Sequence, residues 1–123
     1  MPLLSEQNDD VKGWLRVRRF LKERFGKRPD LNAALFLIGM NEVQVAQPEY
    51  TKEDKQDLMH VAMCRILESE GFYRFERYDD DGWPHFVKLA DLPPMRFIEQ
   101  ERFLKRKVAE YFERKGYLEA PDR

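Results

Sequence analysis

The sequence predicts an α+β fold with three N-terminal helices, one antiparallel β-hairpin at about 72–78 and 83–89, and one long C-terminal helix. Apolar residues recur at helical spacing in three early segments and again in the last one. Two runs rich in aromatic and β-branched residues flank Asp79-Asp80-Asp81-Gly82, which is a hairpin signal. Together these observations predict helices that pack against a single hairpin.

The first helix is expected at about 9–25. Asp9 and Asp10 suit the positive end of the helix dipole, and Gly26 followed by Pro29 stops the helix. Apolar residues at helical spacing form its expected buried stripe, namely Val11, Trp14, Leu15, Leu21 and Phe25. The opposite side is expected to carry Lys12, Arg16, Arg19 and Glu23.

The second helix is expected from Leu31 to about Gln47, with Asp30 as its cap and Pro48 after its end. Its segment 33–40 is apolar on all sides, which predicts a central, buried helix. Gly39 lies within this segment and costs up to about 1 kcal/mol against alanine. We therefore expect a neighbouring helix or aromatic ring to pack closely at Gly39.

The third helix is expected to start at Thr51, with Asp54 three residues later as in a capping box, and to stop at Gly71. Its first half, 52–57, is polar and is expected to be exposed. Its second half is apolar around most of the circumference, which predicts packing on several sides.

Two registers fit the hairpin. A three-residue loop with a left-handed glycine pairs Phe75 with Val87. The same loop pairs Arg77 with His85, whereas a four-residue loop instead pairs Phe75 with Phe86. We favour the three-residue loop because it places four apolar residues on one face that a helix can bury, namely Tyr73, Phe75, Val87 and Leu89.

The last helix is expected from Pro94 to about Lys115, because proline suits a first helical turn and Gly116 provides the stop. Its apolar face is expected to comprise Phe97, Ile98, Leu104, Val108, Tyr111 and Phe112.

The length and composition predict a single soluble globular domain over 1–123, with loosely ordered tails at 1–8 and 118–123. The chain has 123 residues, of which 42% are hydrophobic and 37% charged. It has no apolar run near the roughly 20 residues that cross a bilayer, so no membrane partner is expected. Its one cysteine, Cys64, excludes an internal disulfide and suits a reducing cytoplasm, which is the predicted location.

Charge is distributed unevenly along the chain. Residues 1–28 carry a net charge of +4, residues 29–91 a net charge of −7, and residues 92–123 a net charge of +2. Segments of opposite sign neutralise one another within a fold or across a self-association surface.

A metal site is one hypothesis for the third helix. Asp57, His60 and Cys64 lie on one side of this helix at spacings of three and four residues, and all are metal-ligand types. One helix supplies only part of a coordination shell, so Glu42 or His85 would have to complete it. We prefer a simpler interpretation, in which Asp57 is solvated, His60 lies at the core boundary and Cys64 fills the core. No metal or other cofactor is therefore expected.

A ligand pocket at the hairpin is a second hypothesis. Trp83, His85 and Tyr73 belong to an aromatic-rich stretch that could wall a small pocket. The simpler interpretation is that these rings pack the hairpin onto helices.

Nucleic-acid binding is the runner-up hypothesis. Three helices followed by a hairpin is the order of a winged helix, which is an analogy of fold alone. The third helix and the hairpin turn are acidic and would repel phosphate, so the contact would fall on basic residues in and after the first helix, namely Lys12, Arg16, Arg19, Lys27 and Arg28. For the same reason no nucleic-acid partner is expected.

The preferred function is a small non-catalytic protein-interaction or assembly module that forms a homodimer or binds another protein. Two serines and one threonine leave few nucleophiles, so no catalytic residue is assigned. The alternative of an enzyme would use His60 or His85 as a base. Several large rings fall off the predicted apolar stripes and would suit an interface, namely Phe20, Tyr50, Phe103 and Tyr117.

Overall fold

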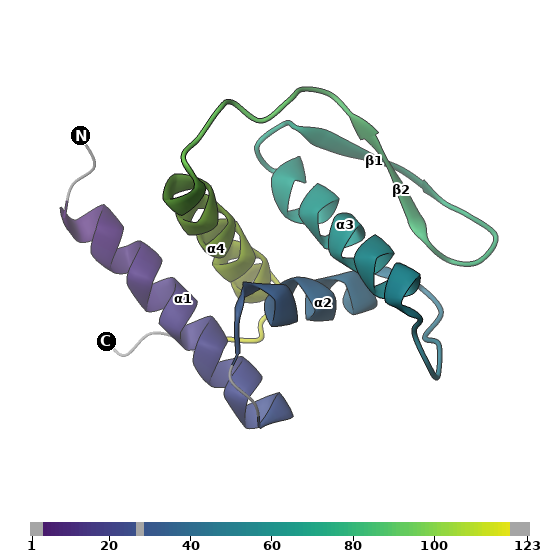
Figure 1. Cartoon of the computed structure of the whole chain (residues 1–123), viewed down its shortest axis with the longest axis horizontal. Helices are drawn as coiled ribbons and strands as arrows, with labels where there is room; N and C mark the ends of the chain where they lie inside the picture. Colours follow the sequence, from purple (N-terminus) through teal and green to yellow (C-terminus); the bar gives the residue numbers. More distant parts are fainter. Residues whose placement is uncertain (1–3, 27–28, 119–123) are drawn as a thin grey trace. The chain divides into compact units, whose positions relative to one another are not determined.

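A computed structural model describes residues 4–26 and 29–118, with side chains from residue 12 onward (Figure 1). Over these ranges the element order is α1 (Leu4–Phe25), α2 (Leu31–Glu42), α3 (Lys52–Glu68), β1 (Tyr73–Tyr78), β2 (Pro84–Lys88) and α4 (Phe97–Arg114). The two strands form one antiparallel sheet. The predicted α+β class and order of elements are confirmed.

Backbone contacts divide the chain into two compact units. Unit 1 comprises residues 1–31 and 95–123 and holds α1 and α4. Unit 2 comprises residues 32–94 and holds α2 beyond its first residue, α3 and the hairpin. The single domain over 1–123 stays a prediction, and residues 1–3 and 119–123 of the expected tails lie outside the described residues.

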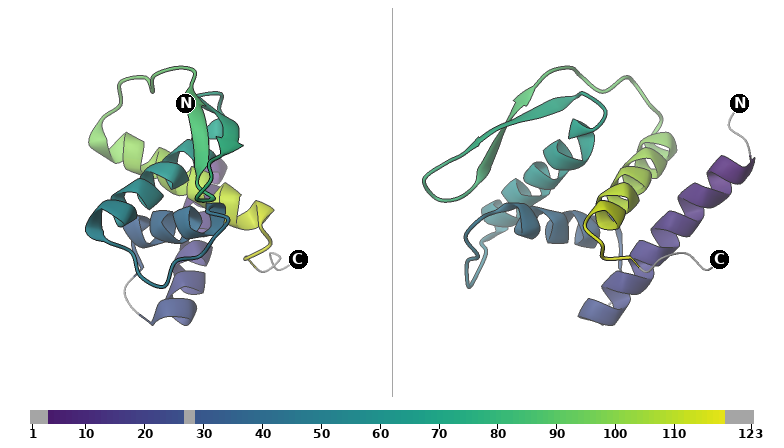
Figure 2. Two further views of the ribbon diagram at one scale, coloured as in Figure 1. Left: turned by 90° about the vertical axis from the view of Figure 1, so that its right-hand side faces the viewer. Right: turned by 180° about the vertical axis from the view of Figure 1, so that it is seen from behind.

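In unit 1, α1 and α4 run side by side in the same direction (Figures 1 and 2). Lys105 Nζ lies 5.2 Å from the ring centroid of Trp14. One turn further along α4, Ala109 Cβ would lie 3.2 Å from a Cβ added to Gly13. The small size of Gly13 and Ala109 therefore allows the two helices to approach closely. The buried side chains of this unit include Val17, Leu21, Leu104, Val108, Tyr111 and Phe112.

The predicted stripe of α1 is partly wrong. Leu15 and Phe25 are 49% and 48% exposed, whereas Val17, which was not in the stripe, is fully buried. The reason is that the line of closest approach to α4 passes through Gly13, and Val17 lies one turn beyond it on the same side. The helix also begins at Leu4 rather than at residue 9, and the side chain of Val11 lies outside the described residues.

The predicted apolar face of α4 is confirmed from Leu104 onward and wrong in its first turn. Phe97 and Ile98 are 83% and 66% exposed. The helix begins at Phe97 rather than Pro94, and its N-cap Arg96 makes no side-chain capping hydrogen bond. Gly116 has φ +75° and ends α4 as predicted.

In unit 2, α2 crosses α3 at Gly39. A Cβ on Gly39 would collide with the backbone carbonyl of Leu58 and lie 2.9 Å from its Cβ, so the predicted close packing is confirmed. The buried residues of α2 confirm that this helix belongs to the core. Its predicted end at Gln47 is wrong, because the chain leaves the helix after Glu42 and the Gln44 N–H donates to the Gly82 carbonyl at 2.8 Å.

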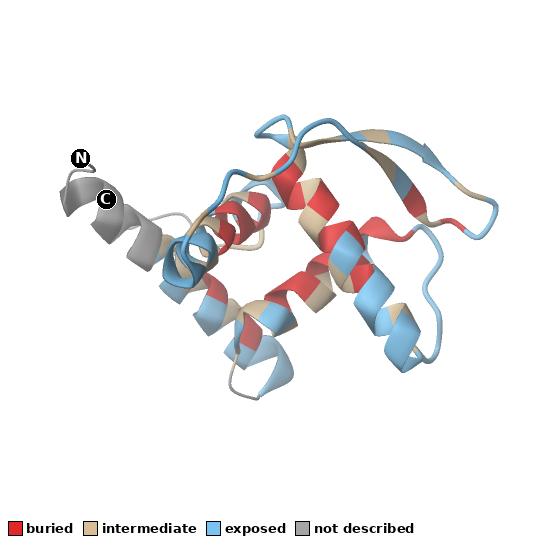
Figure 3. Ribbon diagram, turned by 45° about the horizontal axis from the view of Figure 1, so that its top comes forward, coloured by how far each residue is buried: buried red, intermediate tan, exposed pale blue. Residues whose placement is uncertain are grey.

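The capping box of α3 is confirmed. The Asp54 N–H donates to Thr51 Oγ1 and the Thr51 N–H donates to Asp54 Oδ2, each at 3.0 Å. The first half of the helix is largely exposed and the second half is buried on several sides, as Figure 3 shows. Gly71, with φ +84°, allows the turn from α3 into the hairpin.

The hairpin combines both registers. Arg77 pairs with His85, as in the favoured three-residue loop, but Phe75 pairs with Phe86, as in the alternative. The register shifts between these pairs, where Glu76 has no partner across the sheet. The favoured pairing of Phe75 with Val87 is therefore wrong, and Leu89, expected on the buried face, is 54% exposed.

Candidate functional site

The candidate site is a groove between α3 and the hairpin, wholly within unit 2. It has a volume of about 820 Å³, within the range of ligand sites. The right-hand view of Figure 2 shows the hairpin lying alongside α3, with its turn beyond the first half of the helix. The groove is lined by Val45, Gln47, Asp54, Asp57, His60, Val61, Cys64, Asp79, Asp81, Trp83, Pro84, His85 and Phe86.

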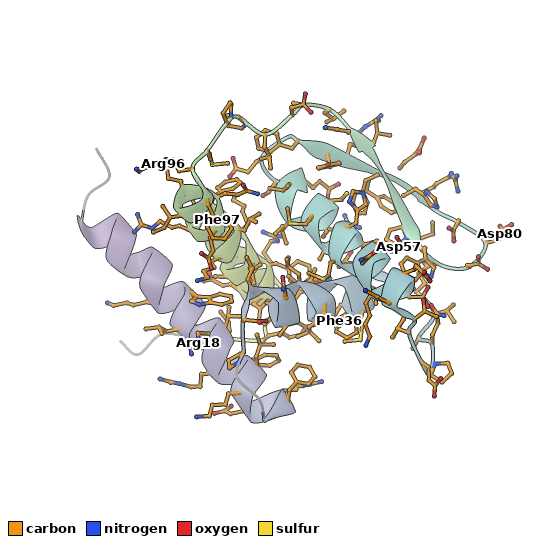
Figure 4. All side chains as sticks on the ribbon, viewed as in Figure 1. Arg18, Phe36, Asp57, Asp80, Arg96 and Phe97 are labelled. Atoms are coloured by element: carbon orange, nitrogen blue, oxygen red, sulfur yellow. The ribbon has the colours of Figure 1, made fainter. Side chains whose placement is uncertain are left out.

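The lining carries negative charge. It contains the carboxylates of Asp54 and Asp57 from α3 and of Asp79 and Asp81 from the hairpin turn, and its residues include no lysine or arginine. Asp57 projects from α3, whereas Asp80, at the tip of the turn, does not line the groove (Figure 4). Such a groove attracts cations and repels anions.

Asp79 organises the turn that forms one wall of the groove. Its Oδ1 accepts the N–H groups of Asp81 and Trp83 at 2.9 and 3.0 Å, and its Oδ2 lies 2.8 Å from His85 Nε2. The hydrogen bond with His85 and the two backbone donors lower the pKa of Asp79 below its ordinary value. Gly82 has φ +83°, so it takes the left-handed position that the turn requires.

His60 and Cys64 form the middle of the opposite wall. Cys64 Sγ lies 3.6 Å from His60 Nε2, and the His60 ring meets the Tyr73 ring edge to face at 6.5 Å. Cys64 is 2% exposed, and burial raises the pKa of its thiol to about 11. The thiol is therefore protonated at neutral pH, which makes it a poor nucleophile and a poor metal ligand.

The structure brings most of the metal candidates to one groove without forming a metal site. Asp57, His60, Cys64 and His85 all line it. Over the described residues, however, no three His, Cys, Asp or Glu side chains lie close enough together to hold one ion. Glu42 does not line the groove, since its carboxylate accepts from Arg65 Nε at 2.6 Å.

Two of the three ligand candidates at the hairpin line the groove, and the third does not. Trp83 and His85 line the groove, Trp83 as a half-buried ring and His85 as an exposed one. Tyr73 does not line it and instead packs against His60.

Arg65 is a key residue that sequence reasoning missed. Besides Glu42, it donates to Glu68 Oε1 at 2.7 Å, and Glu68 Oε2 accepts the Phe75 N–H at 2.9 Å. Its guanidinium lies 5.1 Å from the ring centroid of Phe75 and 4.8 Å from that of Phe86. Arg65 thus links α2, α3 and both strands. The one indication of this role in the sequence is Glu42, an acidic residue that follows the apolar run of the second helix.

The basic candidates on α1 lie in unit 1. Lys12 and Arg19 are exposed and Arg16 is half-buried, whereas Lys27 and Arg28 lie outside the described residues. The order of elements agrees with the winged-helix analogy, but the polar half of α3 and the hairpin turn carry the carboxylates described above. Nucleic-acid binding stays an untested alternative.

The surplus aromatic rings contact other side chains of the chain. Phe20 stacks on Tyr117 with ring centroids 5.4 Å apart, and Tyr50 meets Phe36 edge to face at 6.1 Å. The Phe103 ring lies 5.5 Å from the Arg106 guanidinium. None of the four rings is fully exposed, so these residues no longer supply the argument for an interface.

Searches against family models, curated proteins and solved structures gave no match. Among the described helices, none is long and apolar enough to cross a membrane.

Proposed function

We propose that this protein is a non-catalytic cytoplasmic interaction module whose groove binds a cationic segment of a protein partner, either a second copy of the chain or another protein. The observation that carries the proposal is the lining itself, in which four carboxylates and an indole ring face a groove that receives no lysine or arginine from its own walls. Carboxylates pair with ammonium and guanidinium groups, and aromatic faces attract the same cations.

The exposure of the lining favours a protein segment over an enclosed small molecule. Asp57 and Asp81 are exposed, and Asp54 and Asp79 are half-buried, so a ligand would keep part of its hydration. Long lysine and arginine side chains suit such a site, because their stems cover apolar surface while their charged ends stay near water.

The aromatic rings of the hairpin already bind one arginine of the chain itself, Arg65. The Arg65 guanidinium lies over the rings of Phe75 and Phe86, and Phe86 also lines the groove. Because Arg65 already lies over these two rings, the aromatic contact for a guanidinium from a partner falls on the Trp83 ring, which lines the groove.

A titration of the protein with a flexible peptide that alternates arginine with glycine and serine tests the proposal. We expect micromolar binding by calorimetry that weakens as salt is raised, and no binding of the same peptide with glutamate for arginine. The double variant Asp57→Asn with Asp81→Asn should bind at least about tenfold more weakly, which corresponds to about 1.4 kcal/mol.

The matched control is Glu53→Gln with Asp80→Asn. It removes two carboxylates from the same helix and the same turn, but neither residue lines the groove. We expect it to bind nearly as tightly as the wild type. Equal binding of the basic and acidic peptides, or equal losses in the two double variants, would refute the proposal.

A further inference from the structure

The outer face of α1 carries a row of cations. Lys12, Arg18, Arg19 and Lys22 are exposed and Arg16 is half-buried, while Val17 and Leu21 lie buried on the other side of the helix. Figure 4 labels Arg18 on this helix. Among the described side chains, none of these five cations forms an ion pair.

The two units of the chain have opposite charge. The sequence of unit 1 contains sixteen basic and eleven acidic residues, a net charge of +5. The sequence of unit 2 contains six basic and twelve acidic residues, a net charge of −6. A second copy of the chain therefore carries, on α1, a cationic surface opposite in charge to the groove of the first copy.

We propose that the groove of one copy receives the basic face of α1 from a second copy, and that the exchange is reciprocal. This inference rests on the proposed function and names the partner of the same site. If each copy contributes one α1 and one groove, both contacts close within a dimer, and two-fold dimers are the commonest symmetric assemblies.

The chemistry of the two surfaces agrees. Lys12 and Arg19 are seven residues apart on one face, which spans about 10 Å along a helix. We expect these two cations to pair with one carboxylate from each wall of the groove, Asp57 on α3 and Asp81 in the turn. A nucleic acid on the α1 face is the less favourable partner, because unit 2 would repel it.

Reversal of charge on each surface separately tests the inference. The groove variant is Asp57→Lys with Asp81→Lys, and the helix variant is Lys12→Glu with Arg19→Glu; all four side chains are exposed. In sedimentation at micromolar concentration we expect the wild type at about twice its 14.9 kDa monomer mass and each variant alone at the monomer mass. An equimolar mixture of the two variants should return to the dimer mass, because one contact is then native and the other has both charges reversed.

A matched control is Arg74→Glu with Arg77→Glu, which reverses two exposed cations on the hairpin that do not line the groove. It should remain a dimer. Circular dichroism and thermal melting establish that each variant is folded. Dimerisation of the mixture is independent evidence that both variants are folded.

Each other outcome overturns the inference. A monomeric wild type, a dimer that persists in both single variants, or a mixture that stays monomeric would exclude this pairing, and so would a monomer whose α1 face binds duplex DNA. Failure here is distinguishable from failure of the proposed function: a monomer whose groove still binds the basic peptide retains the proposed function with a different partner.

Discussion

Arg65 Nε lies 2.6 Å from Glu42 Oε1, and this ion pair joins the last residue of α2 to the second half of α3. The side chain of Glu42 is 7% exposed and that of Arg65 is 20% exposed, so water screens the pair only in part. The same guanidinium stacks on rings from both strands. Arg65 therefore holds the hairpin wall to the helices, together with the hydrogen bonds of Gln44 with Gly82 and of Glu68 with Phe75.

Arg65→Ala should destabilise the protein by about 2–4 kcal/mol, because it leaves the buried carboxylate of Glu42 without its arginine and removes the cation from two rings. Urea denaturation measures this free energy of unfolding. Arg96→Ala is the control, since the ion pair of Arg96 with Glu99 is exposed and should cost well under about 1 kcal/mol. Similar small losses in both variants would show that Arg65 does not hold the unit together.

Gly39→Ala should destabilise the protein by about 1–3 kcal/mol, although alanine is the better helix former. The added methyl would meet the backbone of Leu58, which cannot rotate away as a side chain would. Thermal melting measures the change, and Gly13→Ala is the control, because its methyl would meet only Ala109 Cβ at 3.2 Å. Stabilisation by Gly39→Ala would contradict the close crossing of α2 and α3.

Acidification should loosen the hairpin turn through Asp79. The pKa of Asp79 is lowered in the folded state, chiefly by its hydrogen bond with His85, so its contribution to stability is present above about pH 4 and is lost as pH falls through the folded pKa. The amide NMR signals of Asp81 and Trp83 should move together below about pH 4. In Asp79→Asn this acid transition should disappear, whereas Asp80→Asn should keep it; a transition that survives in Asp79→Asn would assign it to another group.

Cys64 should resist alkylation in the native state. With the pKa of its thiol at about 11 and its side chain buried, the thiolate fraction at pH 8 is about a hundredfold below that of an unfolded cysteine. Because the chain has one cysteine, the reaction with iodoacetamide reports this site alone. Comparable rates in buffer and in concentrated urea would contradict the buried, protonated thiol.

Features set by neighbouring residues in the chain were predictable from the sequence. The reciprocal bonds of Thr51 and Asp54 and the left-handed turns at Gly71 and Gly82 depend on a few adjacent residues, and all are confirmed. The class and order of the elements follow from such signals together with hydrophobic periodicity.

Features set by distant contacts were not predictable in this way. The pairing of Phe75 with Phe86 places both rings on Arg65, and no spacing along the chain encodes that meeting. Gln44 leaves the helical pattern for a carbonyl in the hairpin turn, which shortens α2. Both are tertiary contacts that override local preference.

The candidate site was predictable only residue by residue. Asp57, His60, Cys64, Trp83 and His85 were each singled out in the sequence, but their common groove depends on how the hairpin lies along α3. Their chemistry also changes with burial, since Cys64 appeared as a metal-ligand type and is held as a protonated thiol.

The indole N–H signals of the two tryptophans, followed by NMR during titration with the basic peptide, report directly on occupation of the groove. Trp83 lines the groove in unit 2, whereas Trp14 lies on α1 in unit 1. The titration uses the Lys12→Glu with Arg19→Glu variant, whose groove is intact and whose α1 is not expected to bind a second copy, so Trp14 serves as its internal control. If the groove binds cationic segments, the Trp83 signal shifts with a saturable dependence on peptide concentration while the Trp14 signal stays near its starting position. A Trp83 signal that does not move while the peptide binds would contradict the proposed function, because the binding would then occur away from the groove.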